Sequence, residues 1–204
     1  PPAPPLPTRG RGSPRQPESD YDPPMRLYSH PAYPHDPATS IDVTAARSGD
    51  TLKLRYSLIG TISKIAIPTP VEPARADELW KHTCFEVFVR PPEGEAYCEF
   101  NFSPSGQWAA YRFRARRSGM ANIAEPVIRV GSYAAGPDLV MMERSLDLSA
   151  LPELPPGAPW RVALTTIVEQ ADGTKSYWSL AHPQGNPDFH HADNFALTLP
   201  AELP

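Results

Sequence analysis

The sequence predicts an all-β protein, an antiparallel β-sandwich of the jelly-roll or immunoglobulin-like type with about ten strands. Two observations carry this prediction. Apolar and polar side chains alternate in successive segments, and turn signals separate these segments at intervals of roughly 8–12 residues. The sequence also lacks the long helical periodicity of apolar residues that a helix-containing fold would show.

The clearest alternation lies in residues 83–113, which predict a meander of three antiparallel strands at 83–90, 97–103 and 107–113. The intervening turns contain prolines, which cannot donate to a strand ladder, and glycines, which tolerate positive φ. Pairing across these tight turns places Glu86 opposite Asn101, and it places Glu99 between Phe88 and Tyr111.

This register gives the meander two different faces. One face is apolar and is expected to form the core between two sheets; it consists of Phe85, Val87, Val89, Cys98, Phe100, Phe102 and Trp108. The other face is mixed and is expected to be solvated; it consists of Glu86, Phe88, Glu99, Asn101 and Tyr111. Cys84 and Cys98 fall on opposite faces, so we expect two reduced thiols rather than a disulfide.

The remaining segments predict further strands and one long loop. Strands are expected at 40–47, 51–60, 62–67, 123–130, 138–145, 160–169, 175–181 and 194–199. Residues 68–79 are expected to form a loop because prolines interrupt them. One helical turn is expected within 146–154.

Proline is unusually frequent, and nine of the 28 prolines lie in residues 1–24. That segment has no periodic apolar residues with which to build a core, so we expect a disordered tail at 1–24 and one β-sandwich domain at 25–204. The tail is either an extension upstream of a natural start at Met25 or a linker belonging to a larger chain.

Charge and hydropathy exclude several classes of partner. The net charge is −4, and the one basic cluster (Arg112, Arg114, Arg116 and Arg117) is expected to mark a solvated strand end, so nucleic acid is not expected to bind. No apolar run approaches the roughly 18 residues of a membrane span, so no membrane association is expected. No secretory signal is recognisable either, which predicts a cytoplasmic location. The oligomeric state stays open.

Aromatic and polar residues near the mixed face suggest a binding site. Trp80 and Trp178 could stack on the apolar face of a sugar ring, and we expect them to lie close together at one end of the sandwich. His82, Glu86, Glu99 and Asn101 would then supply the hydrogen bonds to hydroxyl groups. The alternative is that both tryptophans pack in the core.

Catalysis and metal binding are the competing chemistries. Glu86 and Glu99 share one strand face, as an acid pair that cleaves a glycosidic bond requires. A metal could be held by His82, His182, His190, His191 and Asp188, but their spacing matches no zinc signature and adjacent histidines on an extended segment point to opposite sides. We therefore expect neither a metal nor another cofactor.

Several segments resemble a known family: LWKHTCFEVFV, EFNFSPSGQWAAYRF, SGM and YWSLAHPQGNPDFHHADNF. They are similar to the DOMON-like group of bacterial proteins, which is related to the type 9 carbohydrate-binding modules, and the similarity spans about residues 25–200. The resemblance implies a β-sandwich and sugar binding, with Trp80 and Trp178 as the clamp. The chain departs from those modules because they normally serve secreted enzymes, and here no signal peptide or catalytic domain is recognisable.

Together these observations predict a non-catalytic domain that binds a carbohydrate or a similar small polyol. Two alternatives stay open: a metal-dependent or acid-pair hydrolase acting on a related substrate, and a structural or partner-binding domain.

Overall fold

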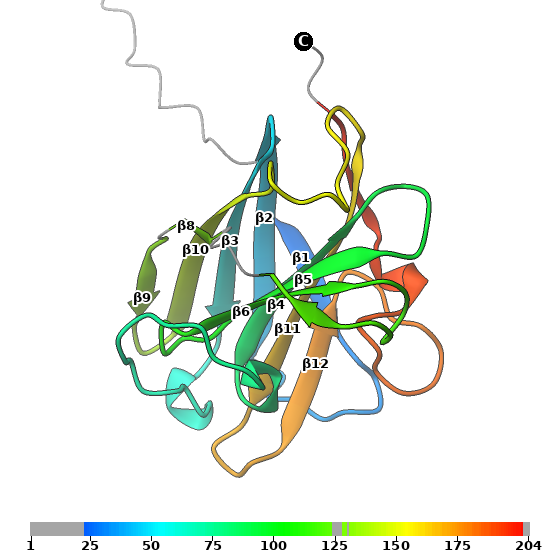
Figure 1. Cartoon of the computed structure of the whole chain (residues 1–204). Coiled ribbons are helices and arrows are strands. Elements are labelled where there is room, and N and C mark those ends of the chain that lie inside the picture. Colours follow the sequence, from blue (N-terminus) through cyan, green and yellow to red (C-terminus); the bar gives the residue numbers. More distant parts are fainter. Residues whose placement is uncertain (1–22, 124–127, 130, 202–204) are drawn as a thin grey trace, which may run out of the picture.

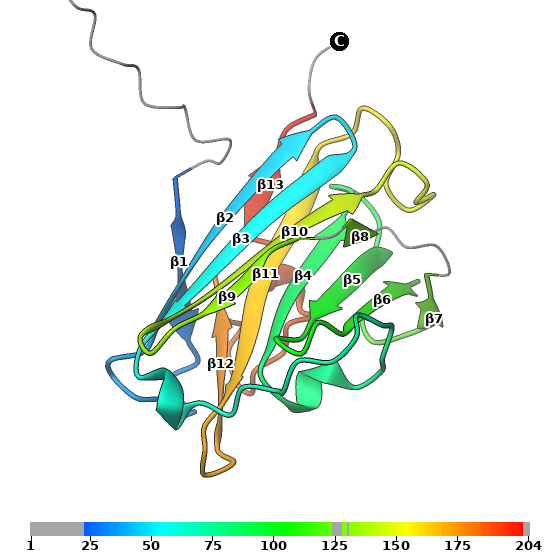
Figure 2. The same cartoon turned by 90° about the vertical axis from the view of Figure 1, so that its left-hand side faces the viewer.

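The computed structural model describes residues 23–123, 128–129 and 131–201, and it confirms an antiparallel β-sandwich. Two layers pack face to face (Figures 1 and 2). The first layer contains β2 (Ser40–Ser48), β3 (Thr51–Ile59), β8 (Ile128–Arg129), β9 (Tyr133–Ala135) and β10 (Leu139–Asp147). The second layer contains β4 (Cys84–Arg90), β5 (Tyr97–Phe102), β6 (Trp108–Phe113), β7 (Ala121–Asn122), β11 (Trp160–Glu169), β12 (Lys175–Ser179) and β13 (Leu197–Leu199).

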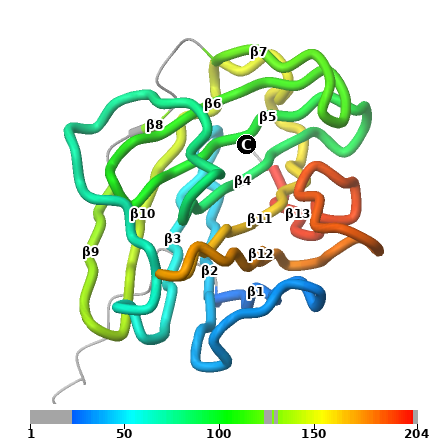
Figure 3. The backbone as a smooth tube through the Cα atoms, turned by 90° about the horizontal axis from the view of Figure 1, so that it is seen from below, coloured from blue at the N-terminus to red at the C-terminus, as the bar shows by residue number. Residues whose placement is uncertain are grey.

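A single strand, β1 (Met25–Ser29), joins the two layers. It pairs with β2 on one side and with β12 on the other, so the strands follow the continuous order β7-β6-β5-β4-β11-β12-β1-β2-β3-β10-β8. Outside this series, β13 pairs with β11 and β9 pairs with β10. Figure 3 shows β1 between β12 and β2 at the edge of the molecule.

The second layer is covered on both faces. Its inner face packs against the first layer in the main core, where Tyr56 of β3 donates a hydrogen bond of 2.7 Å to the carbonyl oxygen of Glu86. Its outer face carries a second cluster of buried residues: Leu79, Cys84, Phe88, Tyr97, Ala109, Tyr111, Phe113, Ala163, Ile167, Phe189 and Phe195. The cover includes the 3₁₀ helix η2 (Leu79–Lys81) and the segment 187–196, which contains η3 (Ala192–Asn194).

The expected register of the meander is confirmed, and the solvation of its mixed face is not. Glu86 pairs with Asn101, and Glu99 lies between Phe88 and Tyr111. The apolar face forms the core between the layers, and the two cysteines are free and lie on opposite faces. The mixed face, however, is buried: Glu86 is 2% exposed and Asn101 is 0% exposed. It is buried because segments distant in sequence fold over it.

Three local expectations differ from the structure. Residues 62–67 form no strand, because β3 ends at Ile59 and the chain then turns into η1 (Ile62–Lys64), where the amide of Ile62 bonds the carbonyl of Pro137. No helix forms within 146–154: β10 continues as far as Asp147, and two tight turns follow, in which the amide of Leu151 bonds the carbonyl of Leu148 and the amide of Leu154 bonds the carbonyl of Leu151. The last expected strand begins at Leu197 rather than 194, after η3.

Some expectations concern residues outside the described part of the chain. Of the tail expected at 1–24, residues 1–22 lie outside the described part. Of the strand expected at 123–130, residues 124–127 and residue 130 lie outside it. The short strands β7 and β9 were not expected. Among the described residues, no helix is long and apolar enough to cross a membrane.

Candidate functional site

A cavity of about 460 Å³ lies on the outer face of the second layer. Its lining combines aromatic rings with a few charged or polar groups. The lining residues are Trp80, Glu86, Glu99, Tyr111, Phe113, Arg117, Met120, Ile167, Tyr177, Pro187, Phe189 and His190.

Strand order explains how these residues come together. Glu86 lies on β4 and Glu99 on β5, in the centre of the layer, whereas Tyr111 lies on β6 and Tyr177 on β12, on either side. Each tyrosine is paired with a ring from the covering segments. The ring centroids of Trp80 and Tyr111 are 6.1 Å apart, and those of Phe189 and Tyr177 are also 6.1 Å apart. The cavity therefore has acids at its floor and an aromatic pair on each side.

The two acids have few hydrogen-bond donors around them. Glu99 accepts a bond of 2.7 Å from the side-chain amide of Asn101. Glu86 accepts a long bond of 3.4 Å from Thr165 at Oε2 and a bond from the thiol of Cys84. Within the described part of the chain, Oε1 of Glu86 and Oδ1 of Asn101 are buried and have no hydrogen-bond partner.

This environment favours the protonated form of both acids. Burial, and then the charge of Glu99, hold the pKa of Glu86 well above its ordinary value. Burial raises the pKa of Glu99 to about 7, against the opposing effects of Asn101 and Arg117. Register makes the two residues diagonal neighbours on adjacent strands, whose Cα atoms lie roughly 7–8 Å apart.

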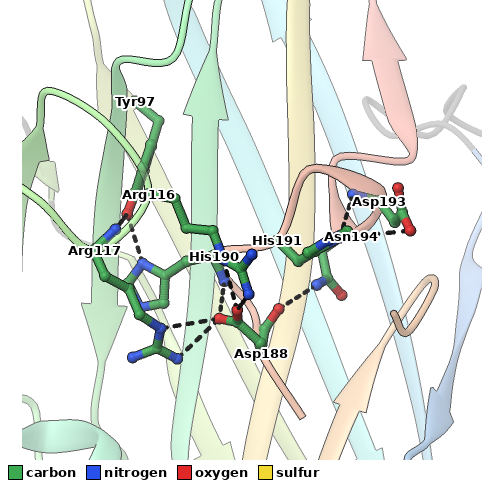
Figure 4. A network of polar contacts seen from close by, with 8 residues as sticks. All are labelled: Tyr97, Arg116, Arg117, Asp188, His190, His191, Asp193 and Asn194. Atoms are coloured by element: carbon green, nitrogen blue, oxygen red, sulfur yellow. Dashed lines mark hydrogen bonds and ion pairs between the residues drawn. The ribbon is translucent and has the colours of Figure 1, made fainter. Parts of the chain in front are cut away.

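A network around Asp188 fixes one rim of the cavity (Figure 4). Arg117 donates to Asp188 from Nε at 3.1 Å and from a terminal nitrogen at 2.9 Å, and Arg116 donates from Nε at 2.9 Å. Burial raises the pKa of Asp188, but the bonds from the two arginines outweigh it and lower this pKa below its ordinary value. Both arginines are exposed, as expected for a solvated strand end, and they also tie the segment 187–196 to the turn after β6.

The same network orients His190. The hydroxyl group of Tyr97 lies 2.7 Å from Nδ1 of His190, and it accepts the amide of Arg117 at 3.2 Å. In the tautomer that carries its proton on Nε2, Nδ1 accepts the proton of the Tyr97 hydroxyl group. Nε2 lies 4.0 Å from Oε2 of Glu99. Burial, and then the charge of Arg117, lower the pKa of His190 to about 4, so the ring is neutral near neutral pH.

Of the residues expected to bind ligand, Trp80, Glu86 and Glu99 line the cavity, and Asn101 lies buried beside Glu99. Trp178 does not join them. Its side chain faces the core between the layers, where it is 3% exposed and packs against the ring of His35, so the expected pairing of Trp80 with Trp178 is wrong. His82 is also outside the cavity lining; its side chain is 65% exposed and pairs with Glu169 at 2.7 Å.

Tyr177, Phe189 and His190 line the cavity but were not among the expected ligand-binding residues. Strand alternation offered a signal for Tyr177, because consecutive residues point to opposite faces and Trp178 fits the core. From the sequence, His190 is a candidate for metal binding or for fixing the carboxyl-terminal segment through hydrogen bonds to loop backbone. Among the described residues, no group of three or more His, Cys, Asp or Glu side chains is arranged to hold a metal ion.

Comparison with known proteins shows a similarity of fold. No family model matches the sequence, and no curated protein matches it. A solved structure of a candidate carbohydrate-binding protein from Bacteroides uniformis is 17% identical with a TM-score of 0.66, over 88% of this chain and 85% of that chain. That protein and this one share a fold.

Two further structures show family 9 carbohydrate-binding modules from Caldicellulosiruptor kristjanssonii. The glucose complex is 10% identical with a TM-score of 0.45, over 78% of this chain and 76% of that chain. The cellotriose complex is 10% identical with a TM-score of 0.48, over 78% of this chain and 74% of that chain. Membership of the DOMON-like group stays a prediction.

Proposed function

We propose that the cavity on the outer face of the second layer binds a carbohydrate or a similar small polyol without changing it chemically. One observation carries the proposal: Glu86, only 2% exposed, lines an aromatic-walled cavity of about 460 Å³ and has a carboxyl oxygen without a partner in the described residues. A buried polar atom without a partner costs free energy, and a ligand hydroxyl group would satisfy it.

The composition of the lining supports the same ligand class. Small-molecule sites are mostly apolar with a few placed polar groups, and this cavity has that composition. The rings of Trp80, Tyr111, Tyr177 and Phe189 offer apolar faces to the carbon skeleton of a sugar. Glu86, Glu99 and His190 offer acceptors and a donor to its hydroxyl groups. The B. uniformis protein with the same fold is described as a candidate carbohydrate-binding protein, which agrees with this proposal.

Calorimetric titration with a panel of monosaccharides and disaccharides tests the proposal. We expect a Kd in the micromolar to millimolar range, because a few hydrogen bonds and ring contacts must offset the lost freedom of the ligand. Trp80→Ala should weaken binding by about threefold to tenfold through loss of one aromatic wall.

His82→Ala is the matched control, because His82 is adjacent in sequence to the Trp80 segment but lies outside the cavity lining. It should leave the affinity unchanged. If no sugar binds at millimolar concentration, or if the His82 variant loses binding while the Trp80 variant keeps it, the proposed site is wrong.

Acid-pair hydrolysis is the second candidate function, and one observation favours it. Two buried carboxyl groups with raised pKa values face one cavity, and their diagonal spacing is within the reach of glycosidase acid pairs. Incubation with chromogenic aryl glycosides decides between the two functions. Binding without release of the chromophore supports the non-catalytic proposal. Turnover that Glu99→Gln abolishes would replace it with hydrolysis.

A further inference from the structure

Within the described residues, no lysine or arginine forms an ion pair with the carboxyl group of Glu86 or Glu99, and Arg117 acts on Glu99 only through its charge at longer range. Glu86 is 2% exposed and Glu99 is 5% exposed. Within the described residues their hydrogen bonds come from neutral groups: the hydroxyl of Thr165 and the thiol of Cys84 for Glu86, and the amide of Asn101 for Glu99. A buried carboxyl group ionises readily only beside a cation, and without one it keeps its proton, so an entering cation can take the place of the protons that this pair holds.

The positive groups nearest to the cavity are already engaged. The guanidinium of Arg117 donates two hydrogen bonds to Oδ1 of Asp188, of 3.1 and 2.9 Å, and the Arg117 side chain is 58% exposed. The imidazole of His190 lies no nearer to Glu99 than 4.0 Å, and its lowered pKa leaves it neutral near neutral pH. Arg112, next to Glu99 in the sheet, pairs with Glu153 at 3.1 Å on the other face.

The walls of the cavity also favour a cation. The faces of aromatic rings carry negative charge density, and they attract ammonium groups most strongly where water is excluded. The cavity has such rings on both sides of the acids, at Trp80 and Tyr111 and at Tyr177 and Phe189. A neutral hydroxyl group would fill an acceptor position and leave the acids protonated, whereas an ammonium group would fill that position and also stabilise the ionised acids.

We propose that the ligand of this cavity carries a protonated amino group, as an amino sugar does, and that this group sits between the carboxyl groups of Glu86 and Glu99. This inference rests on the proposed carbohydrate function and narrows it to a cationic sugar or amino polyol.

Binding of an ammonium group should release protons. The other titratable groups near the acids are Cys84, Tyr97, Tyr111 and Tyr177 on the same face and Tyr56 on the inner face, and for each of them burial raises the pKa further above the neutral range. Arg117 keeps its charge, and His190 is already neutral. The acids themselves are therefore the groups that lose protons when the cation enters.

The experiment compares D-glucosamine, D-glucose and N-acetyl-D-glucosamine by calorimetric titration of the full chain near neutral pH. Charge-assisted hydrogen bonds are stronger than neutral ones by an amount that corresponds to about tenfold in affinity, so we expect glucosamine to bind at least that much more tightly than the two uncharged sugars. The heat of glucosamine binding should depend on the ionisation enthalpy of the buffer, in the sense of net proton release.

Glu86→Gln and Glu99→Gln should remove the preference for glucosamine. Glu78→Gln is the matched control, because it makes the same substitution two positions before Trp80, at a residue that pairs with Lys81 outside the cavity lining. Thermal melting of each variant establishes that it is folded.

The outcomes separate the two proposals. A preference for glucosamine with proton release, lost in both cavity variants and kept in the control, supports the inference. Glucose binding as tightly as glucosamine overturns it and leaves the proposed carbohydrate function standing. Absence of binding by all three sugars, in a protein that melts cooperatively, overturns both.

Discussion

Glu99 shows how burial changes the chemistry of a single side chain. The residue is 5% exposed, and burial is the largest cause that raises its pKa from the ordinary value of 4.5 to about 7. The folded protein therefore keeps a proton that the unfolded chain releases. Acids held in this way do not stabilise a fold at neutral pH, which fits residues kept for binding rather than for stability.

The pH dependence of stability follows from this shift. Since the folded state binds more protons than the unfolded state between pH 4.5 and about 7, the contribution of Glu99 to the free energy of unfolding is full below that window and falls as the pH rises through it. We therefore predict that Glu99→Gln gains stability relative to wild type as the pH rises. Urea unfolding of both proteins at several pH values measures this difference.

His190 produces the opposite trend and serves as an internal reference. The pKa of His190 in the folded protein, about 4, lies below the ordinary value of 6.5. Its contribution to the free energy of unfolding is therefore full above pH 6.5 and is lost as the pH falls towards 4. Both proteins retain His190, so its effect largely cancels in the difference. Parallel pH profiles for wild type and Glu99→Gln would contradict the raised pKa of Glu99.

Phe100 represents the opposite face of the same strand. It is fully buried in the core between the layers, so Phe100→Ala should lower the free energy of unfolding by on the order of 3–5 kcal/mol. Tyr28→Ala removes a ring of similar size from a side chain that is 62% exposed, and it should cost about 0.5 kcal/mol or less. Equal losses, measured by chemical unfolding, would mean that Phe100 does not pack in the core.

Alternation predicted which residues share a face but not what covers that face. The apolar and mixed sets of the meander were both identified from the sequence, because a period of two is a local property. The burial of Glu86 depends on the outer cover, which includes residues 79–81 and 187–196. No local pattern reports such a long-range contact, so the mixed face was expected to be solvated and Trp178 was expected to face the ligand.

At the scale of elements, the long paired strands were predicted well and the short edge strands were not. β11 has the predicted bounds, because its ten residues alternate between two covered faces and turns flank it. β9 has three residues and, in the described part of the chain, pairs with β10 alone, so its position is set by a neighbouring strand rather than by its own pattern. Such edges depend on close backbone contacts.

Gly131 makes one of these close contacts with β10. A Cβ atom at this position would overlap the main-chain carbonyl of Glu143 and would lie 3.0 Å from the Cα of Arg144. Backbone atoms of a paired strand cannot move aside easily, so Gly131→Ala should destabilise the protein by about 1–3 kcal/mol. Chemical unfolding measures the loss.

Gly136 provides the control for this substitution. It lies at the other end of β9, where the nearest atom to a new Cβ is the carbonyl oxygen of Leu139 at 3.9 Å, an ordinary contact. Gly136→Ala should change stability by about 0.5 kcal/mol or less. A similar loss for both variants would show that the effect comes from backbone conformation rather than from the contact with Glu143.

The whole molecule depends on one strand that belongs to both layers. β1 pairs Met25 with Val43 of β2 and pairs Tyr28 with Ser179 of β12, and its Leu27 is 1% exposed in the core. Through β12 the same strand borders the layer that carries the cavity. The integrity of the site is therefore linked to the point where the two layers join.

This arrangement gives a prediction about the amino-terminal end of the sequence. Residues 1–24 contain nine prolines and no periodic apolar residues, so we expect them to add nothing to the core. A chain that begins at Met25 keeps every β1 pairing and should melt at the same temperature as the full chain. A chain that begins at His30 lacks β1, leaves β2 and β12 with unpaired edges, and should lose cooperative melting or melt many degrees lower.

Differential scanning calorimetry of the three proteins separates these contributions. A lower melting temperature for the chain that begins at Met25 would show that residues before the first strand contribute to the fold, and an unchanged melt for the shorter chain would show that the layers hold together without β1.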